Sequence, residues 1–141
     1  MSEDILETAE TSKNTVLIIT DSCELAGELS SILSEANIDP FVADTRDLYL
    51  KKITQYPRPV VAIVDEDMIP GGWKISEDIR NDSEVPIIII GDSDSELAWM
   101  RAAEGKIDYF LGRPFGPLEL VARIRSLARR SKRLTNIAEV M

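Results

Sequence analysis

The stretch from Phe110 to Arg130 reads FLGRPFGPLELVARIRSLARR and decides the fold. It opens on the end of an apolar run and continues through a basic residue before a Pro-Phe pair. Apolar residues then recur at helical spacing, and Pro117 suits the first turn of a helix. The stretch therefore predicts a strand, a short turn and a long amphipathic helix.

Four more short apolar runs precede that stretch, and they are rich in β-branched residues and bounded by polar turns. Such runs are typical of strands that are buried on both faces of a parallel sheet. The predicted strands cover residues 15–20, 41–43, 60–64, 86–90 and 109–111.

Helical patterns lie between and after the predicted strands. They occur around Leu25, Leu29 and Leu33, and over residues 47–55, 73–80, 96–104 and 117–133. Short polar residues followed by Glu three positions later predict helix N-caps at Asp21 and Ser93, and Gly105 is placed to end the fourth helix. The alternation predicts an α/β, flavodoxin-like fold, with a doubly wound five-stranded parallel sheet in the order 2-1-3-4-5 and five helices.

Length and composition indicate one domain in a reducing compartment. We expect the domain over residues 15–133 of the 141, between a flexible segment at 1–14 and a tail or linker start at 134–141. Histidine is absent and Cys23 stands alone, which excludes His/Cys metal sites, Ser/His/Asp or Cys/His catalysis and an intrachain disulfide. No signal peptide or membrane-spanning run is present, so we expect a cytoplasmic protein without a membrane partner.

Charge is spread unevenly along the chain. Residues 123–133 carry six Lys/Arg and no acid, whereas the rest carries ten Lys/Arg against all 25 acids. The acidic body should repel nucleic acid. We therefore interpret the basic stripe as a solvated helix face with ion pairs, and we expect no direct binding of nucleic acid.

Polar residues collect where the predicted strands end, which is where ligands bind in folds of this kind. They are Thr20 and Asp21, then Asp65, Glu66 and Asp67, then Gly91 and Asp92, and last Arg113. Clustered carboxylates around one basic group suit a hard divalent cation with oxygen ligands. The simpler alternative stays open: Asp21 caps its helix, and residues 65–67 form a polar turn.

With these landmarks in order, residues 15–131 resemble the CheY-like receiver domain of response regulators. In that family a lysine before the Pro-Phe pair sits over a phosphorylated aspartate, and an aromatic residue three positions earlier reports the phosphorylation state. Arg113 and Phe110 hold those positions here. The resemblance implies Mg²⁺ as the cofactor, at Asp21 and Asp65, and a histidine kinase or another regulator as a partner.

The chain departs from the receiver pattern at each switch or pocket position. Thr20 replaces one acid of the acidic pair, Gly91 replaces a Ser/Thr, Arg113 replaces the lysine, and Phe110 lacks a phenol hydroxyl. Without a hydroxyl at position 91, a new phosphate loses its link to loop rearrangement. These departures predict an atypical receiver, or pseudo-receiver, with weak or no phosphorylation and no enzymatic activity.

The phosphoacceptor has two candidates. Asp65 directly follows the apolar strand, as the acceptor does in the family, and we favour it. The usual four-residue spacing back from Pro70 instead reaches Glu66, which would act as a fixed negative charge.

The closing helix resembles the OmpR/PhoB subfamily, in which the fourth helix, fifth strand and fifth helix form a two-fold dimer face. By that resemblance the dimer face contains Asp108, Glu119, Arg123 and Arg130. The alternative is an ordinary amphipathic helix whose Leu118, Val121, Ile124 and Leu127 pack on the sheet.

Three functional hypotheses follow. The first is a pseudo-receiver in signal transduction and transcription regulation that acts through dimerisation or partner binding. The second is a working phosphoacceptor, phosphorylated on Asp65 by a histidine kinase with Mg²⁺. The third is a flavodoxin-like domain that binds a small molecule, although no Gly-rich phosphate loop follows the first strand.

Overall fold

The structure is a computed structural model that describes residues 14–92, 96–104 and 107–140. Strands and helices alternate along the chain as β1 (Thr15–Ile19), α2 (Cys23–Glu35), β2 (Asp39–Ala43), α3 (Arg46–Thr54), β3 (Val61–Asp65), α4 (Gly72–Asp82), β4 (Ile87–Asp92), α5 (Glu96–Ala103), β5 (Tyr109–Arg113) and α6 (Pro117–Val140). The predictions for residues 1–13, for a helix cap at Ser93 and for Gly105 fall outside the described residues.

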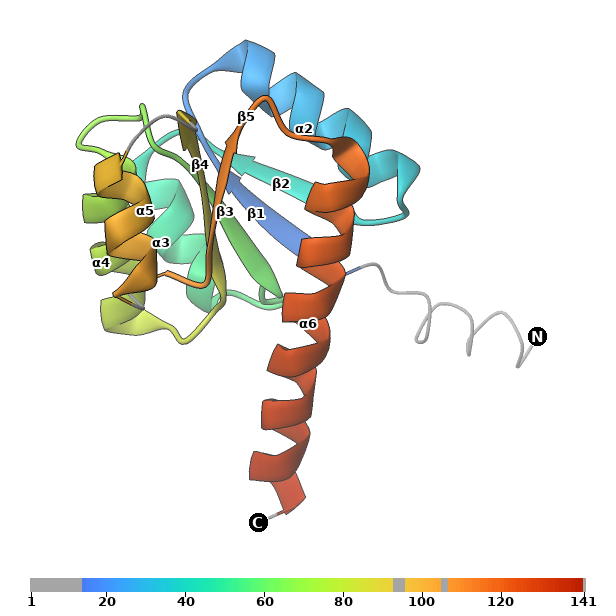
Figure 1. The fold of residues 1–141 in the computed structure, drawn as a ribbon. Helices are drawn as coiled ribbons and strands as arrows, with labels where there is room; N and C mark the ends of the chain where they lie inside the picture. Colours follow the sequence, from blue (N-terminus) through green and yellow to red (C-terminus); the bar gives the residue numbers. More distant parts are fainter. Residues whose placement is uncertain (1–13, 93–95, 105–106, 141) are drawn as a thin grey trace.

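The five strands form one parallel sheet in the order β2-β1-β3-β4-β5. Helices α2 and α6 cover one face of the sheet, and α3, α4 and α5 cover the other (Figure 1). The predicted doubly wound α/β fold is therefore confirmed, including its strand order, and the described residues contain all five of the predicted helices.

Each face of the sheet has its own core, because successive side chains of a strand point to opposite faces. On β3, Val61 and Ile63 pack toward α2 and α6, whereas Ala62 and Val64 pack toward α3 and α4. The same alternation continues to the end of the strand. It directs Asp65 to the α2 and α6 face.

Strand β2 corrects the prediction that every strand is buried on both faces. It is an edge strand, and Phe41 and Val42 are 36% and 39% exposed. An edge strand lacks a neighbour on one side, and its outer side chains are less covered. The Lys52 ammonium lies 4.9 Å from the centre of the Phe41 ring and covers part of it.

Two helix starts also differ from the prediction. Ser22, and not Asp21, is the N-cap of α2, because its hydroxyl accepts a hydrogen bond from the Leu25 amide at 3.2 Å. At the start of α6, Leu118 is 86% exposed and Leu120 is buried in its place. The buried stripe of α6 is therefore set by Leu120, Val121, Ile124 and Leu127.

Helix α6 continues to Val140, so the predicted domain boundary at residue 133 falls inside it. In Figure 1 the end of this helix extends past the sheet. Among the described residues, no helix combines the length and apolar character needed to cross a bilayer.

Candidate functional site

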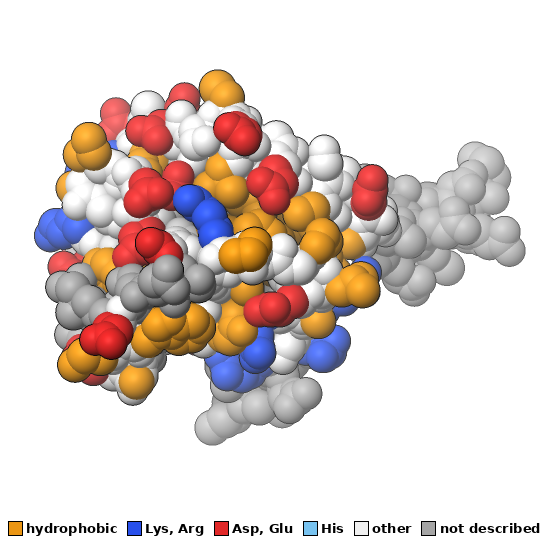
Figure 2. All heavy atoms as spheres, turned by 45° about the horizontal axis from the view of Figure 1, so that its top comes forward, with side chains coloured by type: hydrophobic (Ala, Val, Ile, Leu, Met, Phe, Trp, Pro, Cys, Tyr) orange, Lys and Arg blue, Asp and Glu red, His pale blue; other side chains and the backbone are white. Residues whose placement is uncertain are grey.

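The strands end at one edge of the sheet, which is at the top of Figure 1 and turned forward in Figure 2. Asp and Glu side chains crowd this face, with basic side chains among them and a band of hydrophobic side chains alongside (Figure 2). Asp65 lies at the centre of the hydrogen bonds formed here. We call Thr20, Asp65, Asp67 and Arg113 the edge cluster.

The Asp65 carboxylate is 4% exposed and is contacted at both oxygens. Its Oδ2 accepts a hydrogen bond from Thr20 Oγ1 at 2.6 Å, and its Oδ1 accepts one from the Asp67 amide at 2.9 Å. Arg113 Nη2 lies 3.5 Å from the same Oδ1. A buried carboxylate is stable only when it is paired and hydrogen-bonded, and these contacts meet both needs.

Thr20 joins the start of α2 to the end of β3. Its hydroxyl, in a residue only 1% exposed, donates to Asp65 and accepts from the Ser22 amide at 3.0 Å. A carboxylate at this position would lie against the Asp65 carboxylate, and two buried like charges disfavour each other. The threonine at position 20 therefore gives Asp65 a neutral hydrogen-bond donor in place of a second acid.

Arg113 spans two carboxylates with the two ends of its guanidinium. Nη2 faces Asp65, and Nη1 lies 3.5 Å from Asp67 Oδ2. Both distances are long for hydrogen bonds but within ion-pair range. The Arg113 side chain is 40% exposed and also lines an open groove of about 440 Å³ with Leu25, Glu28, Pro114 and Phe115.

Glu66 lies on the other face of the sheet, against Gly91. A Cβ added to Gly91 would overlap the Glu66 carboxylate and come within 2.8 Å of Glu66 Cδ and 3.0 Å of Glu66 Cβ. The Glu66 amide donates to the Ile90 carbonyl at 3.0 Å, which extends the pairing of β3 with β4 by one residue. The Glu66 side chain therefore fills the space that a residue-91 side chain would need.

A second glycine keeps the chain after Glu66 close to it. A Cβ on Gly72 would come within 2.9 Å of Glu66 Cα, and the Gly72 amide donates to the Glu66 carbonyl at 3.2 Å. Because any larger residue would clash with backbone here, glycine permits the start of α4 to pack on the end of β3. Sequence reasoning missed this role of Gly72.

No protein-family model matches the chain. Among curated proteins, the Transcriptional regulatory protein BaeR of Escherichia coli O6:H1 is 28% identical over 119 residues. The Regulatory protein VanR of Enterococcus faecium is 31% identical over 126 residues. The alignments cover 83% and 88% of this chain but 49% and 54% of the relatives, so the chain spans about half the length of the curated relatives it matches.

Solved structures match over the same region. The receiver domain of the Francisella response regulator 1452 has a TM-score of 0.75 at 25% identity, with 84% of this chain and 99% of that chain covered. The chain is a response-regulator receiver domain. Its site can therefore be compared, position by position, with the receiver pattern.

The Mg²⁺ site that the resemblance implies does not fit the donors of this receiver. Asp21 is exposed, and both Asp65 oxygens already accept hydrogen bonds from the chain. Within the described ranges, no group of three or more Asp, Glu or Cys side chains is placed to hold a metal ion. A hard cation needs several free oxygen ligands, which the described part of this receiver does not bring together.

The switch aromatic of the receiver is packed inside the core. Phe110 is 1% exposed, and the Trp99 ring of α5 meets it edge to face, with ring centres 5.0 Å apart. Such aromatic pairs add to the stabilisation from burial. Trp99 itself is 46% exposed, so it covers Phe110 from the solvent side.

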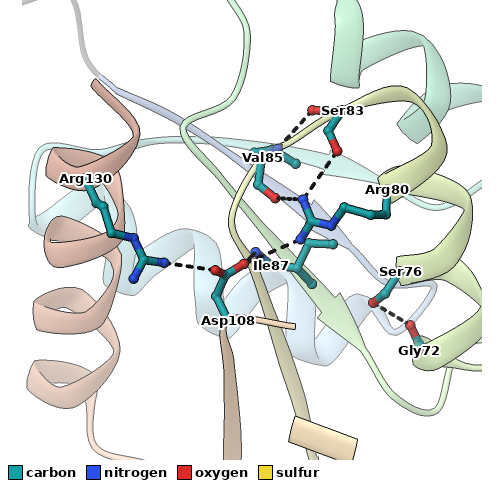
Figure 3. A network of polar contacts seen from close by, with 8 residues as sticks. All are labelled: Gly72, Ser76, Arg80, Ser83, Val85, Ile87, Asp108 and Arg130. Carbon is teal, nitrogen blue, oxygen red and sulfur yellow. Dashed lines mark hydrogen bonds and ion pairs between the residues drawn. The ribbon is translucent and has the colours of Figure 1, made fainter. Parts of the chain in front are cut away.

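Asp108 and Arg130, two residues of the predicted dimer face, contact each other within the receiver (Figure 3). Asp108 Oδ1 is 2.9 Å from Arg130 Nη2, and its Oδ2 accepts from the Ile87 amide at 2.8 Å. Arg80 completes this group, with Nη2 3.5 Å from Asp108 and Nη1 donating to the Val85 carbonyl at 2.8 Å. Sequence reasoning missed Arg80, whose only signal was its place in the last turn of α4.

The other two predicted dimer residues contact Tyr109 of their own chain. The Tyr109 hydroxyl donates to Glu119 Oε1 at 3.2 Å. The Arg123 guanidinium lies 4.1 Å from the centre of the Tyr109 ring. All four predicted dimer residues therefore have partners within one receiver domain.

Sequence reasoning also missed a buried tyrosine of α3. Tyr49 is 1% exposed, and its hydroxyl has no hydrogen-bond partner in the described part of the chain. Burial raises the pKa of this hydroxyl, and the nearby Asp78 carboxylate raises it further, while Arg46 lowers it. Arg46 and Asp78 form an ion pair at 3.3 Å.

Proposed function

We propose that this receiver domain acts in signal transduction by presenting one fixed conformation to a partner, with weak or no phosphorylation. The observation that carries the proposal is the Glu66 carboxylate, which fills the space above Gly91. The receiver pattern places a Ser/Thr there to contact a phosphoryl group. Here the Glu66 side chain fills that space, and residue 91 has no hydroxyl that could contact a phosphoryl group.

The state of Asp65 supports the same proposal. Phosphoryl transfer requires a carboxylate oxygen that approaches the donor in line, with a cation to spread the charge. Asp65 is 4% exposed, and its oxygens are occupied by Thr20 and the Asp67 amide. A phosphoryl donor would have to displace the short Thr20 hydrogen bond before it could react.

One observation favours the second hypothesis, a working acceptor at Asp65. Arg113 contacts Asp65, as the family's basic residue contacts its acceptor. On this hypothesis the edge cluster opens when a histidine kinase binds, so that an Asp65 oxygen can accept the phosphoryl group. Asp65 and Glu66 remain separate candidates for the phosphoacceptor, because their side chains lie on opposite faces of the sheet.

Intact mass spectrometry after incubation with acetyl phosphate or phosphoramidate and Mg²⁺ tests both hypotheses. We expect no phosphoryl adduct on the wild type or on Asp65→Asn and Glu66→Gln. The combined variant Thr20→Asp/Glu66→Asp/Gly91→Thr/Arg113→Lys rebuilds the family pattern and serves as a positive control. A wild-type adduct lost only in Asp65→Asn would establish the second hypothesis and reject the first.

Homodimerisation through α5, β5 and α6 is a further part of the proposal. Trp99, Met100 and Leu118 are 46%, 62% and 86% exposed, which places apolar side chains on these elements. The charged residues of this face would have to exchange their partners within the chain for partners across the two-fold axis. Sedimentation of wild type and Arg123→Glu tests this, because the reversed charge should weaken the dimer.

The chain matches about half the length of its curated relatives, and this supports a proposal about the protein to which the domain belongs. We propose that the domain belongs to a cytoplasmic transcription regulator with a histidine kinase or another regulator as partner, and that any contact with nucleic acid is made outside this domain. Co-purification of the domain with candidate kinases, followed by phosphotransfer assays, tests the kinase part.

A further inference from the structure

We infer that the Arg113 guanidinium takes the place of the divalent cation in this receiver domain, so that the end of β3 and the following loop are held together without Mg²⁺. The inference goes beyond the proposed function, because it concerns what binds the acids of the edge cluster and not whether they are phosphorylated.

The position of the guanidinium carries the first step. Its two ends lie 3.5 Å from Asp65 and 3.5 Å from Asp67, which are the last residue of β3 and a residue of the loop after it. A divalent cation joins carboxylates in the same way, by placing positive charge between them. Arg113 comes from β5, so it also ties this loop to the far edge of the sheet.

Occupancy of the oxygens carries the second step. Asp65 Oδ2 is bound by the Thr20 hydroxyl, and Oδ1 by the Asp67 amide and by Arg113. An entering Mg²⁺ would have to displace Thr20 or Arg113 from a carboxylate that is 4% exposed. Its charge would also lie next to the guanidinium, and the two cations would repel each other.

The residue types carry the third step. Arginine presents a planar fork that reaches two acceptors at once, whereas lysine concentrates its charge at one point. Thr20 supplies a neutral donor where the family has an acid. This replacement leaves less negative charge for a divalent cation to neutralise. The replacements at positions 20 and 113 therefore act together: one removes a metal ligand and the other provides a built-in cation.

Thermal unfolding in MgCl₂, compared with NaCl of equal ionic strength, tests the inference, with titration calorimetry as a direct measure of binding. We expect no Mg²⁺-specific rise in melting temperature and no saturable heat for the wild type. Arg113→Ala should melt at a lower temperature, should gain a Mg²⁺-specific rise, and should regain stability in millimolar methylguanidinium. Arg58→Ala, an exposed arginine in the loop before β3, is the matched control and should show none of these changes.

A saturable Mg²⁺ response of the wild type would overturn the inference, as would a folded Arg113→Ala variant that gains no Mg²⁺ response. If Arg113→Ala does not fold, Thr20→Asp/Arg113→Lys replaces it, because this pair restores the family's ligand and compact ammonium. Mg²⁺ binding by that pair supports the inference, and its absence rejects it.

The outcome is separable from that of the proposed function. A wild-type Mg²⁺ response without a phosphoryl adduct would overturn the built-in cation and leave the proposed function in place. A phosphoryl adduct that forms equally well in EDTA would overturn the proposed function and leave the built-in cation in place.

Discussion

Two aspartates at opposite edges of the sheet are each held by arginine, but they differ in what lies closest to the carboxylate. Asp65, at the carboxyl edge, is 4% exposed and bonds most closely to the neutral Thr20 hydroxyl at 2.6 Å, with Arg113 at 3.5 Å. Asp108, at the amino edge, has a side chain that is 24% exposed and lies 2.9 Å from Arg130.

The comparison shows how burial changes the role of the partner. At the amino edge, water shares the solvation of Asp108, so the close arginines mainly tie α4 and α6 to the sheet. At the carboxyl edge, little water reaches Asp65, so neutral donors must satisfy its oxygens and the guanidinium balances its charge. We therefore expect the carboxyl edge to tolerate changes less well than the amino edge.

Asp65→Ala should produce the largest loss of stability. It leaves the Thr20 hydroxyl and the Asp67 amide without their acceptor, so we expect the free energy of unfolding to fall by about 3 kcal/mol. Urea unfolding followed by circular dichroism measures the change. Asp67→Ala is the control, because this side chain is 77% exposed. Equal losses in the two variants would contradict the argument from burial.

Asp108→Ala should lower the free energy of unfolding by less, about 2 kcal/mol. It leaves the Ile87 amide without its acceptor, but water can solvate the two arginines that lose their ion pairs. The same urea experiment applies, with the exposed Asp82→Ala as the control. A loss greater than that of Asp65→Ala would reverse the ranking of the two edges.

Gly91→Thr should destabilise the domain by about 1 to 2 kcal/mol, because its Cβ forces Glu66 out of place. In the double variant Gly91→Thr/Glu66→Ala much of this loss should disappear, which a double-mutant cycle detects as coupling. Gly116→Thr is the control, since a Cβ at Gly116 meets no atom within 4 Å. Additive losses would mean that Glu66 does not occupy the space above Gly91.

Tyr49→Phe should have the smallest effect, because the buried Tyr49 hydroxyl has no hydrogen-bond partner in the described part of the chain. The pKa of Tyr49 is raised above its usual 10.0 in the folded chain, so folding favours the neutral hydroxyl. That contribution is complete below pH 10 and is lost as the pH rises above it. The wild type should therefore lose more stability than Tyr49→Phe above pH 10.

Urea unfolding across this pH range measures the difference between the two proteins. Tyr56→Phe is the control, because Tyr56 is 89% exposed and folding does not bury its hydroxyl. Parallel pH profiles of wild type and Tyr49→Phe would show that the buried hydroxyl does not contribute.

Much of the fold could be predicted from local pattern. Short β-branched runs and helical spacing are properties of neighbouring residues, and their alternation left few possible topologies. The errors arose where an element's surroundings decide burial. Phe41 and Val42 are exposed because β2 lies at the edge of the sheet, and Leu118 is exposed because α6 turns Leu120 toward the core.

The residues of the candidate site could be named from the sequence, but their contacts could not. Position after a strand was enough to gather Thr20, Asp65 and Arg113 at one edge. The alternative between Asp65 and Glu66 involved neighbours, and a shift of one residue moves a side chain to the opposite face of a sheet. Spacing alone therefore could not tell which acid meets Arg113 and which meets Gly91.

The sequence by itself determined the alternating α/β architecture, the edge at which polar residues gather and the positions that depart from the receiver pattern, because these depend on local order along the chain. Only the tertiary structure decided that Thr20 donates to Asp65, that Glu66 fills the space above Gly91, and that Asp108 pairs with Arg80 and Arg130. The physical reason is that each of these contacts joins segments more than twenty residues apart, which become neighbours only when the sheet assembles.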